Sequence, residues 1–166
     1  NANWRGCKAD AYEGGHRVPY IARWPAQIPA GSASDQVMCT TDLLATVAGI
    51  TGVPLPAGAG EDSVNMLPAY TDPDMSQQIR DHTIHHSLNG HFAIRKGNWK
   101  YTNRLGSGGF SQPSEHPTDD DSLLGSLYDL AADPGETNNL YREHPEIVRA
   151  LTGLLEQTQH MGHRHE

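Results

Sequence analysis

Two segments of the chain space their apolar residues at intervals of three or four, which is typical of a helix with one buried face. The first segment follows Asp42, and its apolar positions are Leu43, Leu44, Val47 and Ile50. Gly52 comes next, at the place where a residue in the left-handed conformation ends many helices. The pattern predicts a helix that Thr40 or Thr41 can cap and that ends at Gly52, and a shorter helix is expected over residues 64–70.

The second segment predicts the longest helix of the chain, from about Pro145 to His160. Pro145 suits the first helical position, and Glu146 suits the positive end of the helix dipole. The apolar face consists of Ile147, Leu151, Leu154 and Leu155, flanked by Val148. Burying this face against a small antiparallel sheet is the natural packing solution.

Short alternating runs after residue 82 predict that sheet. Four strands are expected, at residues 83–87, 91–95, 99–102 and 126–130. The second and third strands should form a hairpin, with Lys96, Gly97 and Asn98 at its turn. A further apolar run, Val18–Trp24, ends at Pro25 and is also expected to be a strand.

Composition divides the chain into two regions. The 166 residues include 17 Gly and 11 Pro, so loops are abundant. The polar segment 71–81 is expected to link a first region, residues 1–70, to a second, residues 71–166. Residues 103–122, rich in Gly, Ser and Asp, are expected to be an insert of low order.

Charge and hydropathy exclude several classes of partner. The formal net charge is -8, and no basic stripe is interleaved with aromatic residues, so nucleic acid is not an expected partner. No apolar run reaches the length of a membrane span, so no membrane partner is expected. No signal-peptide pattern is present, but a chain that starts at Asn1 leaves the compartment open. Cys7 and Cys39 allow one disulfide or two free thiols.

Three segments carry a family pattern. Residues 6–19 read GCKADAYEGGHRVP, residues 93–100 read AIRKGNWK, and residues 127–140 read LYDLAADPGETNNL. Together with DLLAT at 42–46, they resemble, in order and spacing, the C-terminal part of the formylglycine-dependent sulfatases, within the alkaline-phosphatase-like superfamily. Cys7 departs from the pattern, which more often has Gly at that position.

This resemblance implies an α+β fragment. It would hold the last strand and helix of a sulfatase α/β core, in residues 1–70. A small four-stranded antiparallel sheet packed on one long C-terminal helix would follow, in residues 71–166. The resemblance implies a parent that uses calcium and a formylglycine made from a Cys outside this chain, with no cofactor within the chain. A periplasmic or secreted parent is expected.

Sulfate ester hydrolysis needs a nucleophile at sulfur, positive charge around the sulfuryl oxygens and an acid for the leaving oxygen. This chain lacks the Cys-x-Pro-Ser-Arg segment that supplies the family's nucleophile, so the chain alone is expected to be inactive. By resemblance, Lys8 matches the lysine that contacts a sulfate oxygen. The substrate would be a sulfated carbohydrate or an aryl sulfate, and the N-terminal sulfatase domain would be the partner of this chain.

Several other groups have competing interpretations. The histidines at 82, 85, 86 and 91 could bind metal, but neighbours on a strand point to opposite faces, so no metal site is predicted. His85 and His86 are candidates for a substrate-pocket rim. Residues 13–17 are interpreted as structural, with Arg17 paired to a buried carboxylate. Core packing is favoured over a carbohydrate platform for Phe92, Trp99 and Tyr101. The acidic runs 119–121 and 133–136 are interpreted as solvated loops.

Two alternative functions stay open. The chain could be a non-catalytic binding or structural module, because it lacks the nucleophile. It could also be a fragment of a related phosphodiesterase or phosphonate hydrolase of the same superfamily. An isolated chain would leave Val18–Trp24 without strand neighbours, so self-association through this segment, or local disorder, is expected.

Overall fold

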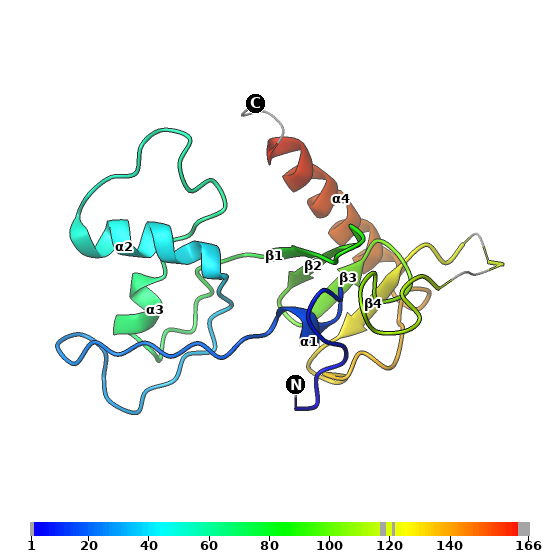
Figure 1. The fold of residues 1–166 in the computed structure, drawn as a ribbon, viewed down its shortest axis with the longest axis horizontal. Helices are drawn as coiled ribbons and strands as arrows, with labels where there is room; N and C mark the ends of the chain where they lie inside the picture. The colour runs from blue at the N-terminus through cyan, green and yellow to red at the C-terminus, as the bar shows by residue number, and fades with distance from the viewer. Residues whose placement is uncertain (1, 117–118, 121, 163–166) are drawn as a thin grey trace. The chain divides into compact units, whose positions relative to one another are not determined.

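The computed structural model describes residues 2–116, 119–120 and 122–162 (Figure 1). Contacts divide these residues into two compact units. The sheet unit comprises residues 2–18 and 84–162, and the helical unit comprises residues 19–83. The first 18 residues therefore pack with the second half of the chain. The predicted division at residue 70 concerns membership of two domains in a longer protein, and it stays a prediction.

The sheet unit is built on a four-stranded sheet in the order β1-β2-β3-β4. The strands are β1 (Thr83–His86), β2 (Phe92–Lys96), β3 (Trp99–Thr102) and β4 (Ser126–Asp129). Strands β2 and β3 are antiparallel, as are β3 and β4. Lys96 pairs with Trp99, and Gly97 at the turn has a φ of 58°, which glycine adopts without steric cost. The predicted sheet and hairpin are confirmed.

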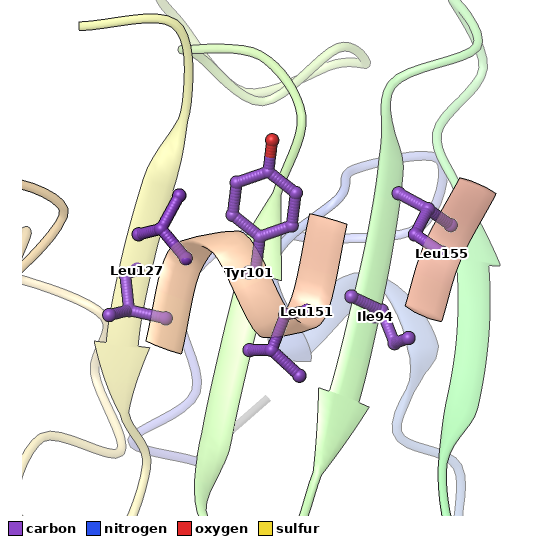
Figure 2. Close-up of a cluster of buried hydrophobic side chains, with 6 residues drawn as sticks. Ile94, Tyr101, Leu127, Leu151 and Leu155 are labelled. Carbon is purple, nitrogen blue, oxygen red and sulfur yellow. The ribbon is translucent and has the colours of Figure 1, made fainter. Parts of the chain in front are cut away.

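Helix α4 (Pro145–Gly162) covers this sheet and forms the main hydrophobic core with it. Figure 2 shows Leu151 and Leu155 of the helix beside side chains from three strands. The fully buried cluster consists of Ile94, Tyr101, Leu127, Val148, Leu151 and Leu155. Phe92 and Trp99 pack against its edge. The predicted long helix is confirmed, as is core packing rather than a carbohydrate platform for the aromatic residues of the hairpin.

A short helix, α1 (Glu13–His16), precedes the sheet in sequence and belongs to the same unit. Only one turn long, it has Glu13 at its start, where a carboxylate suits the exposed amides. The Glu13 side chain is 3% exposed. A buried carboxylate needs compensating partners, and these come from distant parts of the chain, as described below.

The helical unit contains a 3-10 turn, η1 (Thr40–Asp42), and the helices α2 (Leu43–Thr51) and α3 (Leu67–Thr71). Its centre is polar. The buried Asp42 carboxylate accepts hydrogen bonds from the Cys39 and Val64 amides, at 2.8 and 3.0 Å, and pairs with Arg80. Gln36 similarly bonds the backbone at Gln77 and Ile79, so part of the predicted linker is fastened to this unit.

The apolar face of α2 points to solvent in this chain. Its four predicted members are 41–54% exposed: Leu43, Leu44, Val47 and Ile50. Gly52 adopts the left-handed conformation (φ 69°) that was predicted to end the helix. The periodicity therefore identified the helix correctly, although the described residues leave about half of its apolar face exposed.

The prediction of a strand at Val18–Trp24 is wrong for this chain. No secondary structure forms there, and Val18 and Ile21 are 64% and 91% exposed. A strand is stabilised by hydrogen bonds to neighbouring strands, and no described segment of the chain pairs with these residues. An apolar run of this kind is typical of a strand buried on both faces. The sequence pattern indicates such an environment, which this chain alone does not provide.

The interpretation of residues 103–122 as an insert of low order is also wrong over its first part. Residues 106–114 pack against the first residues of the sheet unit, where the Ala11 amide donates to the Ser107 carbonyl and the Phe110 amide donates to Asp10 Oδ1. The rest of the segment includes positions 117, 118 and 121, which lie outside the described residues.

None of the described helices is long and apolar enough to cross a membrane.

Candidate functional site

Lys8 lies on a tight turn that closes on itself. The Asp10 amide donates to the Cys7 carbonyl at 3.1 Å, and the Cys7 amide donates back to Asp10 Oδ2 at 2.8 Å. Ala9 takes a positive φ of 79°, which is uncommon for a residue with a side chain. The Lys8 side chain is exposed. The turn therefore presents an ammonium group to solvent from a backbone fixed by hydrogen bonds.

Asp10 fastens this turn to a second loop. Its carboxylate is fully buried, and Oδ1 accepts hydrogen bonds from the Phe110 and Ser111 amides at 2.8 and 3.1 Å. Burial by itself raises the pKa of Asp10, but hydrogen bonds from Ser111, Cys7 and Phe110 outweigh it and hold the pKa below its usual range. Asp10 is therefore ionised at neutral pH and acts as a fixed brace.

Two glycines permit the close approach of this second loop. A Cβ at Gly109 would lie 2.3 Å from the Ala9 carbonyl oxygen, and one at Gly108 would lie 2.2 Å from Ser87 Oγ. A third contact comes from the turn after β1, where the Leu88 amide donates to the Ala9 carbonyl at 2.8 Å. The Lys8 turn is thus held from two sides by backbone contacts.

A buried group of charges joins the three segments that carry the family pattern. Lys100, fully buried on β3, places Nζ 2.8 Å from Glu136 Oε1 and 3.1 Å from Glu13 Oε1. The Glu13 amide also donates to Glu136 Oε2 at 2.7 Å. The interpretation of 133–136 as a solvated loop is therefore wrong for Glu136, which is 0% exposed because it completes this group.

Two arginines add further positive charge beside Glu13. Arg17 Nε lies 2.7 Å from Glu13 Oε2, and Arg95 Nη1 lies 3.4 Å from the same oxygen. The predicted pairing of Arg17 with a buried carboxylate is confirmed. Burial raises the pKa of Glu13, but Lys100 and Arg17 outweigh it and lower the pKa to about 2. Burial raises the pKa of Glu136 despite Lys100. Glu13 is therefore the carboxylate that stays charged most firmly.

Sequence reasoning missed Lys100 and Glu136 as partners. Lys100 is predicted on a strand, where alternation indicates a face but no partner, and Glu136 lies in a segment typical of solvated turns. One signal was present: each of the three family segments contains one member of the Glu13–Lys100–Glu136 group. An ion cluster shared by several segments requires a charged residue in each of them.

His85 lies beside the charge cluster, stacked on His16 of α1. The two ring centroids are 4.3 Å apart, and the planes are inclined by 16°. Burial, with the neighbouring His16 and Lys100, lowers the pKa of His85 to about 3. Burial likewise lowers the pKa of His16, whose Nε2 lies 3.1 Å from the Ala11 carbonyl oxygen. Both rings are therefore neutral at pH 7.

The other histidines of the sequence cluster have separate partners. His86 packs on Phe92, with ring centroids 6.0 Å apart. His82 lies against Asp81, and buried His91 places Nε2 2.8 Å from Glu115 Oε1. Among the described residues, no three His, Cys, Asp or Glu side chains are grouped so that they could hold a metal ion. Cys7 and Cys39 are both free thiols.

The geometry thus consists of an exposed lysine on a braced turn, connected through α1 to a buried ion cluster. Comparison with known proteins gives this arrangement a context. No family model matches the chain. An N-acetylgalactosamine-6-O-sulfatase of Bacteroides thetaiotaomicron is 37% identical over 161 residues, which cover 92% of this chain and 29% of the relative. Human arylsulfatase A is 31% identical over 89% of this chain and 31% of its own length.

The chain corresponds to the C-terminal part of sulfatases. A solved structure from work on the metabolism of multiple glycosaminoglycans by Bacteroides thetaiotaomicron is similar to this chain, with a TM-score of 0.78 at 34% sequence identity. The match covers 94% of this chain and 32% of that one. A sulfatase from Pseudoalteromonas sp. shares the fold, with a TM-score of 0.75 at 21% identity. The chain thus spans about a third of the length of the sulfatases that it matches, and the predicted resemblance to their C-terminal part is confirmed.

Proposed function

We propose that this chain is the C-terminal portion of a sulfatase that hydrolyses a sulfate ester on a carbohydrate, and that Lys8 contacts a sulfate oxygen. The observation that carries the proposal is the Lys8 turn, which presents a solvent-exposed ammonium group on a backbone braced by buried Asp10. A compact charge on a flexible side chain suits contact with a tetrahedral anion. The relative named for N-acetylgalactosamine 6-O-sulfate makes a 6-sulfated amino sugar the first substrate to test.

The brace matters because positive charge stabilises a developing anion best when it is already in place. Three backbone amides hold the Asp10 carboxylate, and that carboxylate fixes both ends of the turn around Lys8. The turn leads directly into α1, whose Glu13 is bound to Lys100 and Glu136. We infer that the ion cluster positions the Lys8 turn and takes no part in the chemistry.

The remaining components come from the rest of the sulfatase. By resemblance, the formylglycine nucleophile and the calcium site lie in the part that precedes the Lys8 motif, and that N-terminal part is the partner of this chain. When bound, calcium would neutralise charge on the sulfuryl oxygens. We further propose that residues 1–70 belong to the edge of the large domain and residues 71–166 to a small subdomain.

His85 and His86 stay proposals for the pocket rim, and the two rings differ in exposure and in their contacts. His85 is neutral and stacked on His16, so it can accept or donate one hydrogen bond without adding charge. The His86 side chain is exposed, and its Nδ1 lies 3.0 Å from the Ser87 carbonyl oxygen. Neither is required for the sulfate contact assigned to Lys8.

The experiment is a sulfatase assay of the longer protein with calcium, beside the isolated 166-residue chain. We expect the longer protein to release sulfate from an aryl sulfate and from 6-sulfated N-acetylgalactosamine, and the isolated chain to release none. Lys8→Ala should lower kcat/KM by about two orders of magnitude. Lys96→Ala, at an exposed position on the hairpin, is the matched control. Equal activity of Lys8→Ala and the wild type would contradict the assignment.

The same assay tests the alternatives. Cleavage of a phosphodiester or phosphonate ester in preference to every sulfate ester would favour the related hydrolases. Saturable binding of a sulfated oligosaccharide by the isolated chain, measured by titration calorimetry, would favour a non-catalytic binding module. We expect neither result.

A further inference from the structure

An exposed aromatic ring lies beside the proposed sulfate-contacting lysine. Phe110 is 55% exposed, and its ring centroid lies 6.0 Å from Lys8 Nζ. This distance is the outer limit of a cation–π contact, so the ring attracts the ammonium group only weakly. Lys8 therefore stays available to an anion while the phenyl ring lies within reach of whatever carries that anion.

The backbone under Phe110 is fixed rather than free. Its amide donates to Asp10 Oδ1 at 2.8 Å, and the Gly109 amide donates to Ser107 Oγ at 3.0 Å. The Ala11 amide donates to the Ser107 carbonyl at 2.7 Å, which joins this loop to the Lys8 turn again. The same carboxylate, Asp10, thus sets the positions of both Lys8 and Phe110.

The absence of side chains at two positions strengthens this attachment. Gly108 has a φ of 62° and lies against Ser87 and His91, and Gly109 lies directly on the Ala9 carbonyl. A side chain at either position would push the loop away from the Lys8 turn. The loop that displays Phe110 is therefore built to lie close to this turn.

We propose that Phe110 forms an apolar wall of the substrate site and packs against the face of the ring that bears the sulfate ester. This inference rests on the proposed function, because it takes Lys8 as the sulfate contact. A pyranose ring has a face of C–H groups that packs on an aromatic ring, and an aryl ring packs equally well. A ring held on a fixed loop loses little conformational freedom on binding, so the contact adds affinity efficiently.

The test separates binding of the ring from binding of the sulfate. In the longer sulfatase, Phe110→Ala should raise KM for 6-sulfated N-acetylgalactosamine about tenfold, because an aromatic contact is lost. The inhibition constant of inorganic sulfate should stay within about twofold, because Lys8 is untouched. Phe110→Trp should restore KM. Leu124→Ala removes an equally exposed apolar side chain of the same unit, at 65% exposure, and should change neither constant.

Two outcomes would overturn the inference. If KM stays unchanged in Phe110→Ala, the ring does not contact the substrate. If KM and the sulfate inhibition constant rise together, Phe110 acts by positioning Lys8 and not by binding the sugar. Phe110→Leu keeps apolar bulk without a flat face, and it decides the question should Phe110→Ala fold poorly. Failure of the proposed function is distinct, since the wild-type protein would then release no sulfate.

Discussion

The interiors of the two units of this chain are stabilised by different kinds of contact. The sheet unit buries apolar side chains between α4 and the sheet and encloses an ion cluster beside α1. The helical unit places polar groups at its centre, around Asp42 and Gln36, and leaves the apolar face of α2 exposed. Since burial of apolar surface is the main driving force of folding, the sheet unit has a strong source of stability that the helical unit, with its half-exposed apolar face, lacks.

The largest expected effect breaks the sheet unit at its ion cluster. Lys100→Met removes the ammonium between Glu13 and Glu136, so the buried Glu136 loses its cation and Glu13 keeps only its two arginines. We expect the free energy of unfolding to fall by about 3 to 5 kcal/mol, measured by urea denaturation followed by circular dichroism. Lys96→Met on the same hairpin, at an exposed position, should change it by less than about 0.5 kcal/mol. Equal effects of the two variants would show that the cluster adds no stability.

A matched pair of leucines compares the units directly. Leu151 is 4% exposed in the core of the sheet unit, and Leu44 is 48% exposed on α2. Leu151→Ala should cost about 2 to 5 kcal/mol in the isolated chain, and Leu44→Ala about 0.5 kcal/mol or less. In the longer sulfatase, Leu44→Ala should become costly, because the N-terminal part would cover that face. A small effect of Leu44→Ala in both proteins would argue against such a covering surface.

Acid should weaken the sheet unit selectively. Unfolded His85 takes up a proton near pH 6.5, whereas in the fold it does so only near pH 3. Between these values the unfolded chain binds more protons, so stability falls as the pH is lowered, by about 1.4 kcal/mol per pH unit at most. Glu13, with a pKa lowered to about 2 from 4.5, adds the same trend below pH 4.5. His85→Gln should flatten the thermal-melting profile between pH 6.5 and 4.5, and a parallel profile would contradict this.

The smallest expected effect concerns self-association through Val18–Trp24. Residues 18–23 are exposed, Trp24 is partly buried, and none forms a strand within the described chain, so their backbone groups and apolar side chains can pair with a second copy. Ile21→Asp, at a side chain that is 91% exposed, should reduce any concentration-dependent sedimentation of the isolated chain. Leu124→Asp in the sheet unit is the control. A wild-type chain that sediments as a monomer at all concentrations would refute the prediction.

The sequence predicted the elements of the sheet unit better than it predicted the segment Val18–Trp24. The strands of the sheet unit and α4 were predicted to within two residues at their ends, because their periodicity reflects packing within this chain. Val18–Trp24 has an equally clear apolar pattern, yet no strand forms, because no described segment of the chain pairs with it. Periodicity therefore indicates what environment a segment needs, and not whether the chain supplies it.

Less of the candidate site than of the fold could be predicted from the sequence. Lys8 was identified by resemblance alone, since a lone lysine on a loop carries no signal of its own. Phe110 and Asp10 were not identified, because the Gly- and Ser-rich composition around Phe110 is that of a flexible insert. What orders this loop is a carboxylate 100 residues away in sequence. Such long-range backbone contacts leave no periodic trace that a single sequence could reveal.

The pairing of Glu13 with Glu136 has a consequence for biosynthesis. These residues are 123 positions apart, and a ribosome adds about 5 to 20 residues per second. The segment that carries Lys8 therefore leaves the ribosome many seconds before the partners that fix it. A nascent or prematurely terminated polypeptide that ends before Glu136 would leave the Glu13 amide, at the start of α1, without its carboxylate partner. The order of translation thus makes synthesis beyond Glu136 a precondition for a complete ion cluster beside α1.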